Sequence, residues 1–260
     1  MCVTVCGNES PTGILEKQPA WGLLHPDGKP LGYISPAHPA ARAWLAGVAR
    51  EMVDLYRPDG ILLDYIRFHN RELRLDPAAE KRFEATLPAD CPPAEKTKRL
   101  QAFKEAEMTE LVREISTAVR TARPDTVVAA YCWGHQTLAN HLTAQVWDQW
   151  VEKGYIDMVN VSGYFHHSKY GDAYMATFEK YLTGARKANE ALSRRATLTF
   201  ALGLKTSHGD VRSADDIRGY LHSANRLGLN GVAFFTWDTL LPYLDELDRT
   251  RDILTAFPDR

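Results

Sequence analysis

The chain has 260 residues, of which 45% are hydrophobic and 25% charged, the composition of an ordinary globular protein. Its formal net charge of −2 gives no sign of a nucleic-acid partner, and no stretch approaches the roughly 18 apolar residues of a transmembrane helix. The first residues, "MCVTVCGNES", lack the basic segment of a signal peptide, and the four cysteines match no zinc-binding spacing.

Apolar runs and amphipathic stretches alternate along the whole chain. Short apolar runs predict strands at residues 2–6, 61–65, 126–133, 156–165, 196–204 and 231–237. Amphipathic periodicity predicts helices at residues 38–56, 97–123, 141–153, 171–190, 213–228 and 241–256. Because a strand is followed by a helix six times, the sequence predicts parallel βαβ units in one α/β domain over residues 1–260.

Two of the predicted helices carry more detailed expectations. The helix at 38–56 places six apolar side chains on one face, which we expect to be buried: Ala41, Trp44, Leu45, Val48, Met52 and Leu55. The helix at 213–228 begins with Ser213, which we expect to be its N-cap, followed by an acidic first turn.

The connections between the predicted elements favour a barrel. The helix-to-strand turns are short ("RPDG", "RPDT", "KGYI", "GLNG"), whereas the connections after the first two strands are much longer. Long loops at the carboxyl ends of parallel strands carry the active sites of TIM barrels. An open doubly wound sheet is the alternative, but no G-x-G-x-x-G turn follows a predicted strand. A complete barrel needs about eight strands, so the chain's six predict an incomplete one.

Polar and aromatic side chains gather directly after the predicted strands. They are Asn8 and Glu9; Asp64, Tyr65, Arg67 and His69; Trp133, His135 and Gln136; Ser162, Tyr164, His166 and His167; Lys205, Ser207 and His208; and Trp237 and Asp238. The polar residues at the opposite ends indicate structural roles: Asp59, Asp125, Asp157 and Asn230. Because the carboxyl ends of parallel strands lie at one edge, we expect the first set to form a functional site.

Several reaction classes fit these residues poorly. His166 and His167 are adjacent on a predicted strand and would point apart, so we expect no catalytic metal. The segment "NVSGY" around Ser162 does not provide a nucleophile elbow, and no predicted strand offers an interior lysine for Schiff-base chemistry. The sequence shows no cofactor motif.

Two carboxylates on a face lined with aromatic rings are the equipment of glycoside hydrolysis. Asp64 is the first candidate, and we expect it to be the ionised partner because Arg67 lowers its pKa. Glu9 and Asp238 are the candidates for the second carboxylate. The expected substrate contacts are Arg67, Trp133, His135, Tyr164, His166, Lys205 and Trp237, with the three aromatic rings forming a stacking platform. The alternative is that Asp64 and Arg67 form a purely structural ion pair.

The side-chain alternation of a strand makes a further prediction about the stretch "GILLDY". Leu62 and Asp64 share one face, so Asp64 is expected to point into the mouth of the barrel. Leu63 and Tyr65 share the other face, so Tyr65 is expected to point toward the helix layer.

The stretch "DGILLDYIRF" (59–68) resembles the bacterial glycosyl-hydrolase-like family 10, as does the preceding "YISPAHPAARAWLAGVAREMVDLYRPDG". The segments "WDQWVEKGYIDMVNVSGYF" (147–165) and "NGVAFFTWD" (230–238) are similar to two further family segments. The resemblance implies a TIM barrel and an extracytoplasmic protein. It also implies about two βα units before "CVTVCGNES", so we expect a barrel that lacks its first two units.

The resemblance implies a hydrolase that cleaves O-glycosyl bonds in a polysaccharide or oligosaccharide, with Asp64 among its catalytic residues. The alternative is a non-catalytic carbohydrate-binding or scaffold barrel that has lost its catalytic acid. The expected partner in both cases is a carbohydrate, and neither a nucleic acid nor a membrane.

Overall fold

The computed structural model describes residues 1–7, 13–69, 72–134, 142–250 and 256–257. The chain divides into two compact units. The amino-terminal unit comprises Met1–Ala130 and Gln136–Ile156, and the carboxy-terminal unit comprises Tyr131–His135 and Asp157–Arg260. Each unit shows parallel strands followed by helices, which confirms the βαβ prediction.

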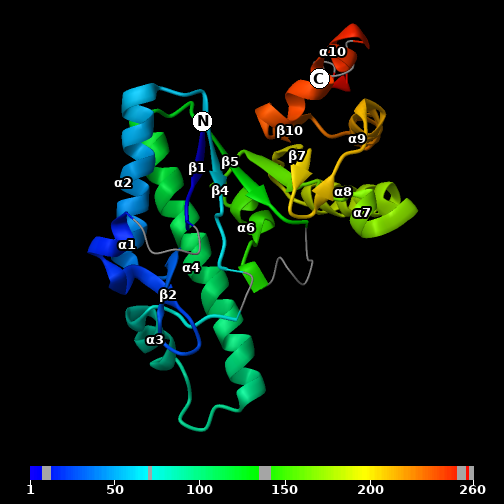
Figure 1. Ribbon diagram of the computed structural model, residues 1–260. Coiled ribbons are helices and arrows are strands. Elements are labelled where there is room, and N and C mark those ends of the chain that lie inside the picture. Colours follow the sequence, from blue (N-terminus) through cyan, green and yellow to red (C-terminus); the bar gives the residue numbers. More distant parts are fainter. Residues whose placement is uncertain (8–12, 70–71, 135–141, 251–255, 258–260) are drawn as a thin grey trace. The chain divides into compact units, whose positions relative to one another are not determined.

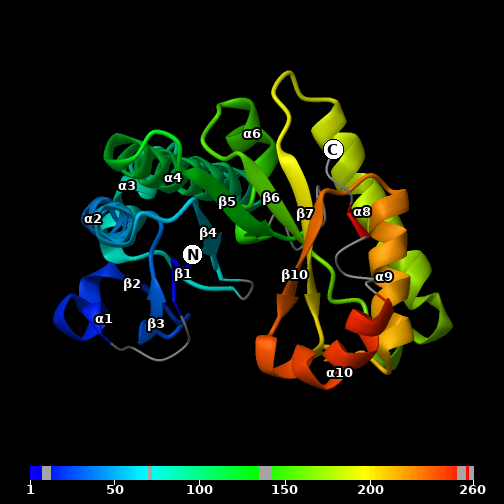
Figure 2. The same ribbon diagram turned by 90° about the horizontal axis from the view of Figure 1, so that it is seen from above.

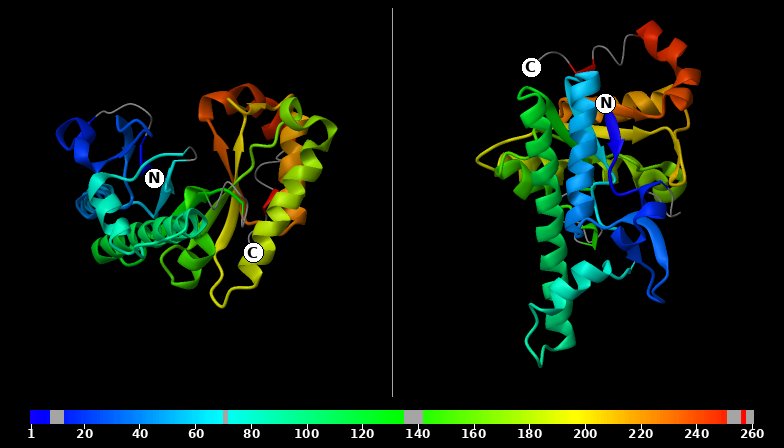
Figure 3. Two further views of the ribbon diagram at one scale, coloured as in Figure 1. Left: turned by 90° about the horizontal axis from the view of Figure 1, so that it is seen from below. Right: turned by 90° about the vertical axis from the view of Figure 1, so that its left-hand side faces the viewer.

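The amino-terminal unit is built on parallel strands backed by helices. Its strands are ordered β1 (Cys2–Thr4), β4 (Gly60–Asp64) and β5 (Val127–Cys132), of which Tyr131 and Cys132 belong to the other unit, and Thr4 is in register with Asp64. Its main helices are α2 (Pro39–Tyr56), α4 (Pro93–Ala122) and α6 (Trp147–Glu152). Helices α2 and α4 lie side by side along much of their length (Figures 1 and 3).

The buried face of α2 differs from the one that the sequence predicts. Ala41, Leu45, Ala49 and Val53 are buried, whereas Trp44 is 38% exposed. Leu55, also predicted to be buried, is 65% exposed. The reason is the close contact with α4, which selects an i, i+4 stripe of mostly small residues, whereas the prediction gave weight to the largest apolar side chains.

The long connections of the amino-terminal unit contain elements that the sequence pattern does not reveal. Between β1 and β4 lie α1 (Ile14–Lys17), η1 (Pro19–Trp21) and the antiparallel pair β2 (Gly22–Leu24) and β3 (Pro30–Ile34). Helix α3 (Pro77–Glu84) follows β4, and its N-cap Asp76 accepts hydrogen bonds from the Ala79 amide and the Ser35 hydroxyl.

The carboxy-terminal unit repeats the parallel arrangement, as Figure 2 shows. Its strands are ordered β6 (Met158–Ser162), β7 (Thr197–Gly203) and β10 (Gly231–Phe235). Its helical elements are α7 (His167–Tyr170), η2 (Gly171–Ala173), α8 (Tyr174–Glu190), α9 (Ala214–Arg226) and α10 (Trp237–Thr250). A short hairpin, β8 (Lys205–Thr206) and β9 (Gly209–Asp210), follows β7.

Two boundary predictions in this unit have different outcomes. Ser213 caps α9 as expected, because its hydroxyl accepts a hydrogen bond from the Asp216 amide. Strand β10 ends at Phe235, so Trp237 and Asp238 lie in the first turn of α10 rather than at a strand end. No helix among the described residues is long and apolar enough to cross a membrane.

Two of the four residues at the amino ends of the strands, Asp157 and Asn230, have the structural contacts that the sequence indicates, whereas Asp59 is fully exposed. Asp59 lies 3.7 Å from the Arg123 guanidinium, and Asp157 pairs with Arg194 at 2.8 Å. The Asn230 side chain accepts a hydrogen bond from the Leu198 amide.

Candidate functional site

Asp64 is the last residue of β4 and is half-buried at the carboxyl end of that strand. One of its carboxylate oxygens accepts a hydrogen bond of 2.8 Å from the Tyr65 amide. Ile61 and Leu63 are buried, whereas Leu62 and Asp64 on the opposite face of the strand are partly exposed. Asp64 therefore shares the more open face with Leu62, as the alternation predicts.

The prediction for Tyr65 is wrong. Its side chain is 39% exposed, and its backbone adopts a left-handed conformation with φ of 50°. The physical reason is that β4 ends at Asp64, so the strand alternation does not extend to the next residue. The Arg67 guanidinium carbon lies 4.9 Å from the centre of the Tyr65 ring, which is a cation–π distance. A non-glycine residue with positive φ costs free energy and often marks a functional position.

The segment that follows Asp64 is anchored by neighbouring parts of the same unit. The Arg67 carbonyl accepts a hydrogen bond of 3.0 Å from the hydroxyl of Tyr33, which is 1% exposed. The Ile66 carbonyl accepts one from the Gln145 side chain, and the Phe68 amide donates one to the Thr143 carbonyl. The position of Asp64 is thus fixed from both sides, as catalysis requires.

Burial raises the pKa of the Asp64 carboxyl, against the opposing effects of the Tyr65 amide and the Arg67 guanidinium. The Arg67 guanidinium lowers the pKa of Asp64, as expected, but the loss of hydration has the larger effect and the net shift is upward. A carboxyl with a raised pKa retains its proton to higher pH, which is the property of a general acid.

Aromatic rings gather at the carboxyl ends of the strands in the other unit. The Tyr164 ring lies 6.2 Å from that of Tyr131 and 6.4 Å from that of Phe235. Phe235 is 52% exposed and Trp237 is 66% exposed, so neither ring is packed under the outer helices. Trp133, expected in the same platform, is partly exposed. We call Tyr131, Tyr164 and Phe235 the aromatic group; sequence reasoning missed Tyr131 and Phe235.

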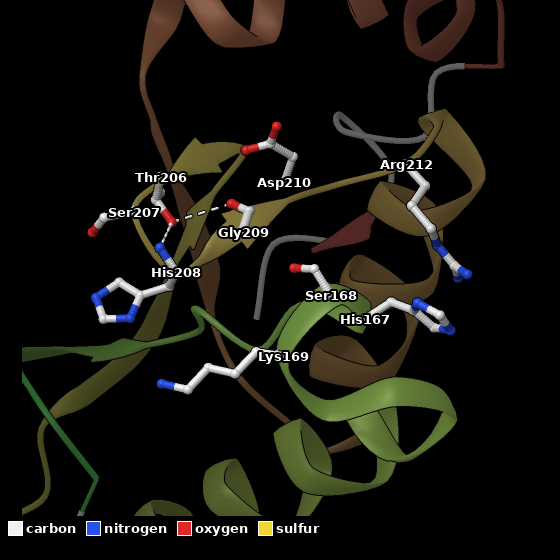
Figure 4. A pocket seen from close by; sticks show the side chains of 9 residues that line it. All are labelled: His167, Ser168, Lys169, Thr206, Ser207, His208, Gly209, Asp210 and Arg212. Carbon is white, nitrogen blue, oxygen red and sulfur yellow. Dashed lines mark hydrogen bonds between the residues drawn. The ribbon is translucent and has the colours of Figure 1, made fainter.

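The loops after β6 and β7 form a pocket with a volume of about 720 Å³ (Figure 4). Its lining, which we call the hairpin pocket, consists of His167, Ser168, Lys169, Thr206, Ser207, His208, Gly209, Asp210 and Arg212. Its volume is within the range of small-molecule sites, about 300–1,000 Å³. Three strand-end residues singled out from the sequence, His167, Ser207 and His208, lie in this lining.

The remaining predicted site residues have separate positions. His166 is only 1% exposed, and neither ring nitrogen has a hydrogen-bond partner in the described structure. Lys205 is an exposed residue of β8 outside the pocket lining. Asp238 is exposed, and a hydrogen bond from the Thr236 hydroxyl lowers its pKa. Glu9 and His135 lie outside the described residues.

Comparison with known sequences identifies the family. A family model described as glycosyl hydrolase-like 10 matches residues 8–199. The chain belongs to this family. The resemblance of the segments around Asp64 and residues 147–165 is thereby confirmed. No curated protein matches the chain.

Solved structures with a similar fold are glycosidases. The PgaB (BpsB) glycoside hydrolase domain from Bordetella bronchiseptica is 16% identical with a TM-score of 0.73, over 100% of this chain and 75% of that one. Bee venom hyaluronidase, solved with a hyaluronic acid tetramer, is 13% identical with a TM-score of 0.57, over 95% and 83% of the two chains. A β-galactosidase from the Antarctic haloarchaeon Halorubrum lacusprofundi is 14% identical with a TM-score of 0.59, over 91% and 42%. The predicted TIM-type fold is confirmed, in the form of a partial (β/α) barrel.

Among the described residues, no group of three or more histidines, cysteines and acids is placed to hold a metal ion. Burial raises the pKa of the Cys6 thiol to about 12, so this cysteine is not a ready nucleophile. The carboxylates therefore remain the principal candidates for chemistry in the part of the chain that the structure describes.

Proposed function

We propose that the protein is a glycoside hydrolase that cleaves a polysaccharide or oligosaccharide, with Asp64 as its general acid. The observation that carries the proposal is the half-buried Asp64 carboxyl at the carboxyl end of β4, where burial raises its pKa. In this role Asp64 donates its proton to the glycosidic oxygen as the bond to the sugar breaks. Membership of a glycosyl hydrolase-like family supports the reaction class.

The mechanism requires a second carboxylate that is ionised when Asp64 is protonated. Asp238 and Glu9 are the two candidates. The lowered pKa of Asp238 supports it as a base or nucleophile, because its carboxylate is already ionised at neutral pH. Arg67 is proposed to position Asp64 and tune its pKa through its positive charge.

The aromatic group supports a carbohydrate ligand. Exposed rings at strand ends offer flat apolar faces on which sugar rings stack, while their neighbours supply hydrogen bonds. We propose that Tyr164, Phe235 and Trp237 contact the substrate, with contributions from Trp133, His135, His166 and Lys205. As the family resemblance implies, we propose that the protein is extracytoplasmic.

A screen of the chain against a panel of glycans tests the proposal. We expect release of reducing ends from at least one glycan by the wild-type protein, and loss of that activity in Asp64→Asn. The matched variants Glu9→Gln and Asp238→Asn then identify the second carboxylate. The variant that lacks this carboxylate should lose its activity and regain it when azide is added as an external nucleophile or base. Turnover that persists unchanged in Asp64→Asn contradicts the assignment.

One observation favours the alternative of a non-catalytic carbohydrate-binding barrel. The exposed Asp238 carboxylate accepts the Thr236 hydroxyl hydrogen bond in the first turn of α10, a position that also suits a purely structural carboxylate. The two functions differ in their products. Glycan binding without release of reducing ends in the wild-type protein is the result that supports the binding function.

A further inference from the structure

The hairpin pocket lies at the carboxyl ends of β6 and β7, between α7 and the β8–β9 hairpin. Helix α7 contacts β9 directly, so the two sides of the pocket belong to one packed structure. Gly209 shows how close this packing is. A Cβ on Gly209 would lie 2.8 Å from the Cβ of His166 and 2.2 Å from the Ser168 hydroxyl oxygen.

Several side chains of the pocket lining already form hydrogen bonds or ion pairs with other residues of the protein. Arg212 pairs with Asp216 at 3.0 Å and donates to the Tyr174 hydroxyl at 3.1 Å. His167 contacts Asp172 at 3.1 Å. The Thr206 hydroxyl donates to the Gly209 carbonyl and accepts from the His208 amide, as the dashed lines in Figure 4 show. These side chains shape the pocket, and Asp216, which lies outside the lining, compensates the charge of Arg212.

The remaining polar side chains form no side-chain hydrogen bond or ion pair within the described structure. They are Ser168, Lys169, Ser207, His208 and Asp210. Figure 4 shows the Asp210 carboxylate and the Lys169 ammonium on opposite sides of the pocket, with the Ser168 hydroxyl between them. The Lys169 ammonium lies 5.6 Å from the Tyr170 ring, and the His208 ring lies 6.1 Å from that of Tyr164 in the aromatic group. The ligand side of the pocket therefore offers donors, acceptors and a neighbouring aromatic face.

Charge balance points to the class of ligand. Lys169 contributes one positive charge and Asp210 one negative charge. Burial, followed by the charge of Lys169, lowers the pKa of His208, so its imidazole is neutral at pH 7. Asp210 repels an anionic sugar while Lys169 attracts it, and the reverse holds for a cationic sugar, so a net charge on the ligand gains little here and still loses its hydration. An uncharged polyol can instead hydrogen-bond to both groups.

From this balance we infer that the hairpin pocket is a subsite for an uncharged sugar residue of the glycan, selected by Lys169 and Asp210 acting together. The inference rests on the proposed function and narrows its substrate class to glycans with a neutral residue at this position. Aromatic contacts from Tyr164 and hydrogen bonds from the pocket side chains supply the two components of sugar recognition.

The test measures binding separately from turnover, in the Asp64→Asn background. A panel of neutral glycans of several linkages is titrated beside counterparts that carry uronate or free amine groups, with the His208 imidazole NMR signals as the local readout. We expect a neutral glycan to bind more tightly than both charged counterparts and to shift the His208 signals. If no neutral glycan does so, or a charged counterpart binds more tightly, the inference is overturned.

Two charge-removing variants test the specificity itself. Asp210→Asn is expected to raise the affinity for the uronate glycan, relative to that for the neutral glycan, about fivefold. Lys169→Gln is expected to raise the affinity for the amine glycan, relative to that for the neutral glycan, by a similar factor. Asp245→Asn and Lys187→Gln remove the same charges from exposed helix positions and should change neither ratio. Unchanged ratios in both pocket variants also overturn the inference.

The outcomes separate this inference from the proposed function. If the wild-type protein releases no reducing ends but Asp64→Asn binds a neutral glycan at His208, the hydrolase assignment fails and the subsite stands. If the wild-type protein hydrolyses a glycan whose binding leaves the His208 signals unchanged, the subsite fails and the hydrolase assignment stands.

Discussion

Replacement of Asp64 by asparagine should raise the thermal stability of the protein at neutral pH while removing its activity. The substitution keeps the shape of the side chain and an oxygen that accepts the hydrogen bond from the Tyr65 amide, and it removes the charge. The folded-state pKa of Asp64 is raised, so its ionised form is less stable in the folded protein than in the unfolded chain. The stability that Asp64 contributes is thus present below its unfolded pKa and is lost as the pH rises through the folded pKa.

The size of the effect follows from linkage. Each unit by which a folded pKa exceeds the unfolded one corresponds to about 1.4 kcal/mol once the group is ionised in both states. For a domain of about 150–250 residues, 1 kcal/mol moves the melting temperature by about 2–4 °C. Asp64→Asn should therefore melt above the wild type at pH 7, and the difference should shrink toward pH 3. Activity should fall by about 10²–10⁴, the usual contribution of a general acid.

Thermal melts of both proteins between pH 3 and pH 8, with glycan hydrolysis measured beside them, test this reasoning. Asp59→Asn is the matched control, since Asp59 lies at the amino end of β4 with its side chain in solvent. It should change stability by less than about 0.5 kcal/mol and leave activity intact. If Asp64→Asn instead lowers the melting temperature at pH 7, Asp64 and Arg67 form a stabilising ion pair and the reasoning is refuted.

Three further substitutions have distinct expected outcomes. Arg67→Gln should raise the Asp64 pKa further and so move the alkaline limb of the pH profile of kcat/KM to higher pH; an unchanged limb would exclude Arg67 from tuning the acid. Phe235→Ala should raise KM about two- to tenfold without changing the melting temperature, whereas the control Leu55→Ala, at an exposed position of α2, should alter neither quantity. Arg42→Met removes buried ion pairs between α2 and α4, and urea unfolding should show a loss of about 3 kcal/mol, with kcat per folded molecule unchanged.

The parallel βα pattern was predictable because it depends on short-range periodicity. Strand β4, with Ile61 and Leu63 buried, and the capped helix at Ser213 carry local signals that tertiary contacts reinforce. The face of α2 was not predictable, because it depends on the partner helix. Arg42 is buried there against carboxylates on α4, and no local pattern of α2 alone indicates that a charged residue faces inward.

The sequence predicts those residues of the candidate site that are polar or aromatic and lie at the end of a strand. Asp64, Tyr164 and His208 were singled out in this way, because each follows or ends an apolar run. Phe235 was missed because an aromatic residue within an apolar run has the same pattern whether its ring is buried or, as here, 52% exposed. The β8–β9 hairpin was missed because two-residue strands leave no periodicity to detect.

The direction of the Asp64 pKa shift shows why residue spacing alone does not assign a catalytic role. Spacing places Arg67 near the carboxyl and predicts a lowered pKa, yet the net shift is upward because burial has the larger effect. Distant parts of the chain hold the loop after β4 in place, since Tyr33 of β3 bonds the Arg67 carbonyl and Gln145 bonds the Ile66 carbonyl. The two roles of a carboxyl pair in glycoside hydrolysis differ only in which group keeps its proton. The net direction of the Asp64 pKa shift therefore depends on the fold, and it is the direction that a general acid needs.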